Sequence, residues 1–157
     1  MLILDEQAER GMRDHGEEGY PHEVCGLLLG NFEEGMKIRR VREARRAGNL
    51  NRERAADRYD LDPADFRRIE EDARLRRMEV VGIYHSHPDH PSRPSETDRQ
   101  RAEEIWQSAE SWSYLILEVA GGIATSRRSW ILRGGVFTEE PIEKPASPRK
   151  DVPCPAS

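Results

Sequence analysis

Three short, nearly continuous runs of apolar residues constrain the fold of this chain more than any other feature. They occupy residues 24–29, 80–84 and 114–119, and each is bounded by glycine or polar residues. Runs of this kind are typical of strands that are buried on both faces of a sheet. A weaker run at 130–132 is followed by Gly134-Gly135 and a further apolar pair, which predicts a tight hairpin. The core is therefore expected to form on a sheet.

The composition permits such a core only because the apolar residues are clustered. Charged residues make up 35% of the 157 residues, but 25 basic residues offset 30 acidic ones and leave a net charge of −5. Disorder by composition combines low hydrophobicity with a high net charge, and this chain lacks the second condition. Its length fits a single domain.

The segments between the apolar runs carry helix signals. Residues 62–77 begin with an Asp N-cap followed by proline at the first helical position. Residues 95–110 place apolar side chains three and four apart, and residues 5–16 form a further expected helix. Residues 37–41 and 58–61 are predicted as additional strands.

Several functional classes are excluded by the same sequence. A net charge of −5 gives no global attraction to nucleic acid or to anionic lipid. The longest apolar run is far shorter than the ~20 residues that cross a bilayer, and the acidic first turn is unlike a signal peptide. Cys25 and Cys154 cannot build a disulfide framework, so a reducing cytoplasm is the expected location. The sequence leaves the oligomeric state open.

The prolines divide the chain into a domain and a tail. Five of the ten prolines lie between Pro141 and Pro155, with Lys, Asp and Ser between them. This composition is typical of disorder. The expected organisation is a domain at residues 1–139 and a disordered, proline-rich C-terminal tail at residues 140–157.

Two histidines at the end of an apolar run indicate a metal site. His85 and His87 directly follow the run at 80–84. Residues two apart on a strand project from the same face, so the two imidazoles converge. Neutral imidazole is the commonest metal ligand, and two on one rigid element supply half of a zinc site. The alternative is a pair of polar residues that merely ends the strand.

A third ligand is available in the segment that follows. Prolines at 88, 91 and 94 stiffen a loop, after which Ser95 and Asp98 share one face of a helix start. A catalytic zinc takes three protein ligands and a water, and Asp98 is the natural third ligand. Spacing alone leaves His90 as a rival ligand. The Ser-x-x-Asp pattern also resembles a capping box, which would give both residues a purely structural role.

A hydrolytic metal site also needs a group that carries a proton. Glu23 is the best candidate, because it opens the strongest apolar run and a carboxylate entering a buried strand is costly unless it has a partner or a task. The alternative places Glu23 exposed at the edge of the strand.

Together these positions resemble the signature of the JAMM (MPN+) zinc metallopeptidases. That signature is an upstream Glu followed by H-x-H-x7-S-x2-D, and the chain matches it at every position, with Glu23, His85, His87, Ser95 and Asp98. The resemblance extends over about residues 1–140 and includes the stretches 21–30, 49–63 and 81–88.

The resemblance implies a fold, a cofactor and a role for each residue. The implied fold is an α/β, cytidine-deaminase-like sandwich with a curved mixed β-sheet flanked by helices. One zinc ion per chain would be held by His85, His87 and Asp98. Glu23 would accept a proton from the attacking water and pass it to the leaving amine, and Ser95 would hydrogen-bond near the tetrahedral oxyanion. His90 has no role in the signature.

The resemblance also suggests a substrate. The chain is similar to short, stand-alone prokaryotic members and has little room for the insertions with which eukaryotic members grip ubiquitin. The implied substrate is a ubiquitin-like sulfur-carrier protein, cleaved next to its C-terminal Gly-Gly. The alternatives are a different peptide substrate, a non-catalytic MPN scaffold that binds partner proteins, and a purely structural zinc site to which only Cys25 could add a thiolate.

Overall fold

The apolar runs form the central strands of a single eight-stranded sheet. The computed structural model describes residues 1–106 and 111–147. In chain order its elements are β1 (Leu2–Leu4), α1 (Glu6–Gly19), β2 (Cys25–Glu33), β3 (Ile38–Ala47), α2 (Pro63–Leu75), β4 (Glu79–Pro88), α3 (Glu96–Trp106), β5 (Ser113–Ala120), β6 (Ile123–Arg133), β7 (Val136–Glu140) and β8 (Ile142–Glu143).

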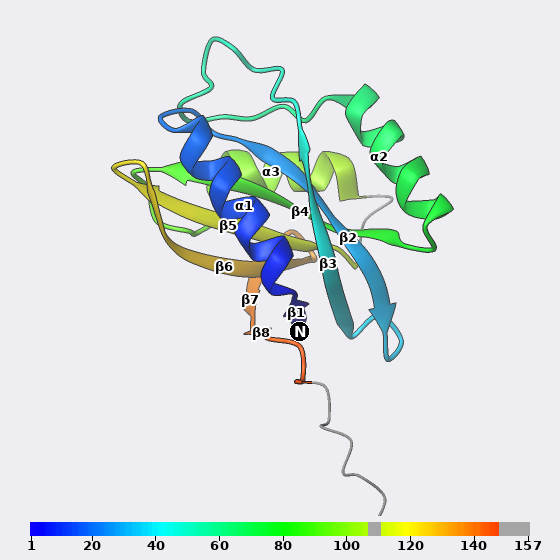
Figure 1. Cartoon of the computed structure of the whole chain (residues 1–157). Helices are drawn as coiled ribbons and strands as arrows, with labels where there is room; N and C mark the ends of the chain where they lie inside the picture. Colours follow the sequence, from blue (N-terminus) through cyan, green and yellow to red (C-terminus); the bar gives the residue numbers. More distant parts are fainter. Residues whose placement is uncertain (107–110, 148–157) are drawn as a thin grey trace, which may run out of the picture.

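The sheet is mixed and strongly curved. Its strand order is β7-β6-β5-β4-β2-β3-β1-β8. Strand β4 is parallel to β5 and antiparallel to β2, and β1 is parallel to both β3 and β8. One residue, Pro141, separates β7 from β8, although the two strands lie at opposite ends of the order. The sheet therefore curves until it nearly closes on itself (Figure 1), as expected for the curved mixed sheet of the predicted fold class.

Helices cover both faces of the sheet. Helix α1 crosses one face, and α2 and α3 lie on the other (Figure 1). Each face has its own apolar cluster: Ala8 and Met12 of α1 pack with Leu28 and Leu115, whereas Ile69 and Ala73 of α2 pack with residues of the opposite face. Within the described ranges, no helix has both the length and the apolar character needed to span a bilayer.

Most of the predicted elements are present. The strands expected at 24–29, 37–41, 80–84 and 114–119 are confirmed as parts of β2, β3, β4 and β5. The hairpin at Gly134-Gly135 is confirmed between β6 and β7, and both glycines have a positive φ that suits a tight turn. All three helices are confirmed, although residues 107–110 of the third prediction lie outside the described residues.

Two details of the sheet differ from the predictions. Residues 58–61 do not form a strand; only Leu61 makes a bridge, with Asn49. The side chain of Asn49 takes the place of a partner strand there, because it hydrogen-bonds the carbonyl of Arg58 and the N–H of Asp60. Strand β1 was not predicted, since three residues are too few to show a pattern.

A buried carboxylate joins the last strands to the first ones. Glu140 is 5% exposed; it pairs with Arg39 at 3.2 Å and with the Met1 amino group at 3.1 Å. Its other oxygen accepts hydrogen bonds from the hydroxyls of Ser113 and Ser129. Because Glu140 and β8 belong to the sheet, its ordered strands extend past the boundary expected at residue 139.

Replacing Glu140 tests this closure. In Glu140→Ala the guanidinium of Arg39 loses its carboxylate partner while it stays 1% exposed, so we expect a loss of about 3 kcal/mol in the free energy of unfolding, measured by urea denaturation. Its neighbour Glu139 forms a half-exposed pair with Arg128. The control Glu139→Ala should cost less than about 1 kcal/mol. Equal losses of stability in the two variants would contradict the larger contribution expected of the buried pair between Arg39 and Glu140.

Candidate metal centre

The two histidines of the predicted site lie on the most deeply buried strand. Every residue of β4 after Glu79 is buried. Alternation along the strand directs His85 and His87 to the face covered by α2 and α3, and Tyr84 and Ser86 to the face of α1. Ser86 accepts a hydrogen bond from the N–H of Val24 at 2.9 Å. It therefore holds the start of β2 against β4 on the face of the sheet opposite the histidines.

Asp98 joins the two imidazoles. The Nε2 atoms of His85 and His87 lie 3.0 Å apart. The two oxygens of Asp98 lie 3.2 Å from Nε2 of His85 and 3.1 Å from Nε2 of His87. All three side chains are buried. The segment after the proline loop thus returns to the end of β4, as the sequence predicted.

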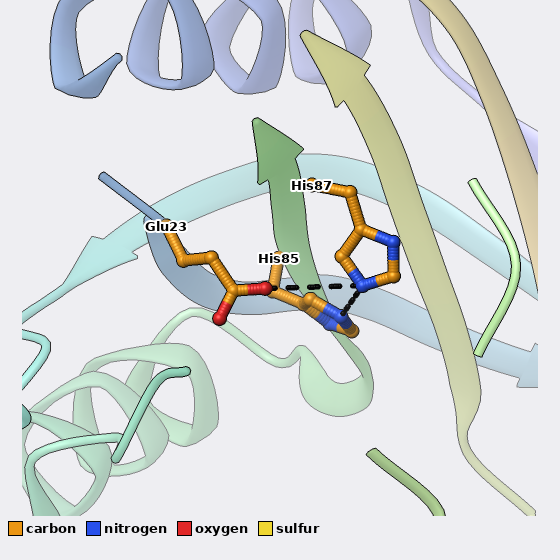
Figure 2. A group of neighbouring side chains, drawn as sticks. All are labelled: Glu23, His85 and His87. Atoms are coloured by element: carbon orange, nitrogen blue, oxygen red, sulfur yellow. Dashed lines mark hydrogen bonds and ion pairs between the residues drawn. The ribbon is translucent and has the colours of Figure 1, made fainter. Parts of the chain in front are cut away.

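Glu23 faces the same point from the start of β2. The register pairs Cys25 with His85, which brings the residues before β2 beside the end of β4. Oε1 of Glu23 lies 3.8 Å from Nε2 of His87, and the side chain is 5% exposed. Figure 2 shows the carboxylate directed at the imidazoles. The alternative of an exposed Glu23 at the strand edge is therefore wrong.

Glu23, His85 and His87 form a compact set of potential ligands. One ligand atom from each lies within 4.8 Å of the other two. Oε2 of Glu23 is buried and has no hydrogen-bond partner among residues 1–106 and 111–147. Buried polar atoms in proteins are nearly always hydrogen-bonded, so an unpartnered carboxylate oxygen here indicates a site for a bound group.

A backbone carbonyl determines the tautomer of His87. Its Nδ1 lies 2.7 Å from the carbonyl oxygen of Pro91, which can only accept, so Nδ1 carries the proton. In the neutral ring, Nε2 then presents its lone pair to the centre. The indole N–H of Trp130 donates to the carbonyl of Ser92 at 3.1 Å and holds this loop on β6.

Ser95 and Asp98 form the capping box that the Ser-x-x-Asp pattern predicts. The N–H of Ser95 donates to Oδ2 of Asp98 at 2.8 Å, and the N–H of Asp98 donates to Oγ of Ser95 at 3.1 Å. Asp98 is buried, whereas Ser95 is exposed at the start of α3. A capping role and a metal-binding role are therefore compatible, because the carboxylate of Asp98 that caps the helix also faces the histidines.

The two carboxyl groups differ in pKa. Burial raises the pKa of Glu23 to about 8; the nearby Asp98 carboxylate adds to this and His87 opposes it. Burial also acts on Asp98, but contacts with His85 and His87 outweigh it and hold the pKa of Asp98 far below its usual range. One carboxyl group thus stays charged while the other can exchange a proton near neutral pH.

The two imidazoles also differ. Burial lowers the pKa of His85 more than Asp98 raises it. For His87, burial also lowers the pKa, but Asp98 and the Pro91 carbonyl together outweigh it, and the net pKa is raised. His85 is therefore the ring that more readily stays neutral.

Two alternatives from the sequence fail on geometry. His90 is exposed on the loop after β4, whereas its rival Asp98 is buried and lies within 3.2 Å of both imidazoles. Cys25 points elsewhere, with Sγ 3.6 Å from the carbonyl oxygen of Gly48, and burial raises the pKa of its thiol to about 12. A structural zinc site with a Cys25 thiolate is not supported.

The donor set fits a divalent metal ion. In their neutral forms the imidazole nitrogens offer lone pairs at the same point as an ionised carboxylate, and a cation bound between them would stabilise this arrangement. Two imidazoles and one carboxylate are a common ligand set for catalytic zinc. The unpartnered oxygen of Glu23 beside them would serve a water or a substrate group.

Comparison with known families agrees with this geometry. Residues 5–133 match the prokaryotic homologs of the JAB domain. The chain belongs to this family. Two relatives bear the name desampylase. The one from Haloferax volcanii is 38% identical over 106 residues, 64% of this chain and 72% of its own length. The one from Pyrococcus furiosus is 36% identical over 76 residues, 48% of this chain and 49% of its own length.

Two solved structures share this fold. A protein from Desulfitobacterium hafniense superimposes with a TM-score of 0.79 at 26% identity and covers 94% of both chains. A protein from Salinibacter ruber gives a TM-score of 0.69 at 33% identity, covering 98% of this chain and 95% of the other. The curved sheet flanked by helices is thus the fold of this JAB-domain protein.

Two residues at the centre of this JAB-domain protein were not predicted individually. Tyr59 stacks on His85, and the side-chain amide of Asn49 bonds the carbonyl of Glu23. The sequence indicated only that the stretch 49–63 resembles the family. Their roles depend on a loop without periodicity, and a pattern of apolar residues carries no information about such a loop.

A cleft of about 720 Å³ adjoins the centre. It lies between α2 and α3 and is floored by Leu27 and Ile83 of the sheet. Tyr59 forms part of its wall and also contacts His85, so the cleft and the metal centre share a side chain. The lining of the cleft combines apolar side chains with charged ones, namely Asp60, Arg67, Glu70, Arg101 and Glu104.

The raised pKa of Glu23 predicts a pH-dependent stability of the metal-free protein. Its carboxyl titrates near 4.5 when unfolded and at about 8 when folded, so its contribution to stability is complete below pH 4.5 and is lost as the pH rises towards 8. We expect the free energy of unfolding of the wild type to fall by roughly 2–4 kcal/mol between pH 5 and 8 relative to Glu23→Gln, which cannot titrate. If the free energy of unfolding, measured in urea, changed equally with pH in the two proteins, the raised pKa of Glu23 would be contradicted.

Proposed function

We propose that this JAB-domain protein is a zinc-dependent peptidase or isopeptidase that cleaves next to the C-terminal Gly-Gly of a ubiquitin-like sulfur-carrier protein. The observation that carries the proposal is the buried Glu23 carboxylate, one oxygen of which is unpartnered and which faces two imidazoles. The name of the relatives, desampylase, supports a protein-modifier substrate. The sequence-based expectation of a cytoplasmic location stays a prediction.

His85, His87 and Asp98 would hold the metal ion, with Glu23 beside them. A bound zinc ion would polarise the scissile carbonyl and lower the pKa of water. The remaining chemistry depends on how the chain orients its own groups. His87 is fixed by the Pro91 carbonyl, and Asp98 by the capping box with Ser95. Two imidazoles and one carboxylate also suit iron, so the metal analysis of the purified protein should include iron as well as zinc.

Glu23 is the proposed proton carrier. A general base works best with a pKa near the operating pH. In the metal-free protein burial raises the pKa of Glu23 to about 8, and a cation bound beside the carboxylate would lower it from there. The carboxylate would take a proton from the attacking water and deliver it to the nitrogen of the leaving amine. The N–C bond of the peptide or isopeptide then breaks, and the carrier keeps a free C-terminal carboxylate.

Ser95 is proposed to act on the oxygen of the scissile carbonyl. Its exposed Oγ lies at the start of α3, where unpaired N–H groups of the helix favour negative charge. A hydroxyl at this point could donate to the tetrahedral oxyanion. Ser95 also anchors Asp98, both with its backbone N–H and with Oγ, which accepts from the N–H of Asp98. An oxygen that accepts in this way can still donate its own hydroxyl proton to the oxyanion.

A glycine-rich tail suits the approach to this centre. Glycine has no side chain, so an extended Gly-Gly end can enter a narrow passage that other residues would block. The histidines, Glu23 and Asp98 are all less than a tenth exposed. A substrate with bulky residues on both sides of the cleaved bond would not reach them.

Metal content tests the ligand assignment. Purified wild type should contain about one zinc per chain, by mass spectrometry of the metal, and His87→Ala and Asp98→Ala should lose it. His90→Ala is a matched control, because His90 lies on the loop that joins β4, which carries His87, to α3, which carries Asp98, but is exposed. Loss of zinc in His90→Ala with retention in Asp98→Ala would overturn the assignment, and a wild type that refuses zinc would favour a non-catalytic scaffold.

Glu23→Gln tests the chemistry separately from metal binding. The variant keeps the shape of the side chain but cannot accept a proton, so we expect zinc to be retained while kcat falls by about 10²–10⁴. The assay would follow hydrolysis of a sulfur carrier extended past its Gly-Gly end. Undiminished activity in Glu23→Gln would remove Glu23 from the role of proton carrier.

A further inference from the structure

The two histidines of the centre are held in different ways. Nδ1 of His87 donates to the carbonyl of Pro91, which fixes the plane of that ring. The polar contacts that the described residues show for His85 are made by Nε2, with His87 and Asp98. Metal-binding histidines are usually oriented by a hydrogen bond at the second nitrogen. For His85, a side chain that packs against the ring can serve this purpose.

Tyr59 makes that contact. Its ring stacks on the imidazole of His85 with the centroids 4.6 Å apart and the planes at 27°. Both side chains are at most 5% exposed. A flat ring lying face to face at this distance opposes rotation of the imidazole about its Cβ–Cγ bond. Such a rotation would tilt the edge of the imidazole into the tyrosine ring.

Asn49 holds Tyr59 in place from both sides. Nδ2 of Asn49 donates to the carbonyl of Arg58 at 3.1 Å, and its Oδ1 accepts from the N–H of Asp60 at 2.9 Å. These are the two residues that flank Tyr59. The same Nδ2 donates to the carbonyl of Glu23 at 3.2 Å. One amide therefore couples the backbone of Glu23 to the loop that carries the stacked ring.

We propose that Tyr59 is a positioning residue, whose ring holds the imidazole of His85 so that Nε2 faces His87 and Asp98. The proposal rests on the metal centre of the proposed function and adds to it the element that orients one ligand. Tyr59 also belongs to the apolar cluster on this face of the sheet. Its contribution to packing must therefore be separated from its effect on His85.

Three variants make that separation. Tyr59→Phe keeps the stacked ring, whereas Tyr59→Leu keeps an apolar side chain but removes the flat face. Phe66→Leu is the matched control, because Phe66 packs against the same cluster, and its aromatic contact recorded in the described residues is with Trp112 rather than with a histidine. The readout is the affinity of each protein for Zn²⁺ alone, measured by competition with a chelator. The absorption spectrum of the Co²⁺-loaded proteins reports the geometry of the ligands.

We expect Tyr59→Leu to bind Zn²⁺ about tenfold more weakly and to change the Co²⁺ spectrum, with Tyr59→Phe and Phe66→Leu close to the wild type. If Tyr59→Leu does not fold, Tyr59→Met takes its place, since it fills similar volume without a flat face. Unchanged affinity in the Leu or Met variant, equal weakening in Phe66→Leu, or equal weakening in Tyr59→Phe would each overturn the proposal.

The same titrations distinguish this proposal from the proposed function. If His87→Ala loses Zn²⁺ while Tyr59→Leu binds as tightly as the wild type, only the role of Tyr59 fails. If the wild type and His87→Ala bind Zn²⁺ equally, the metal centre itself fails, and the role of Tyr59 fails with it.

Discussion

The convergence of lone pairs at the end of β4 is the constraint on which the site depends. Two imidazole nitrogens 3.0 Å apart and a carboxylate within 3.2 Å of both are kept from water by the sheet and the helices. Without a cation such groups repel one another or must share protons. The surrounding structure is organised to keep them together: a carbonyl for His87, a capping box for Asp98 and a stacked ring for His85.

The fold supplies these groups from distant parts of the chain. The antiparallel pairing of β2 with β4 places Glu23 beside the histidines, although about sixty residues separate them along the sequence. The proline loop reverses the chain so that the first turn of α3 returns Asp98 to the strand that precedes it. Because β4 lies in the middle of the sheet, it is a rigid base for the two ligands that it carries.

The sequence predicted the parts of this structure that depend on local pattern. Apolar runs identified the central strands, and the spacing of His85 and His87 identified two imidazoles that do meet. Spacing alone left Asp98 and His90 as rival third ligands, and the resemblance to the JAMM signature favoured Asp98. What could not be predicted depends on contacts between segments. Glu23 could have been exposed or buried until the register of β2 and β4 was known. The loop at 58–61 resembles a strand in composition, but Asn49 satisfies its backbone instead. Strand β1 is defined only by its neighbours, β3 and β8.

The closure of the sheet through Glu140 has a practical consequence for how this protein can be joined to others. Met1 and β8 meet at the end of the sheet where β2 turns into β3, while Glu23 lies before the opposite end of β2, roughly 30 Å away along the strand. Figure 1 shows the N-terminus and strand β8 at the lower side of the sheet, away from the loop at 49–60. An affinity tag or a fused carrier attached at Met1 would therefore leave the approach to the histidines open, but it would replace the charged amino group that pairs with Glu140. A fused Gly-Gly tail would need a linker long enough to travel around the sheet before the protein could cleave it in cis.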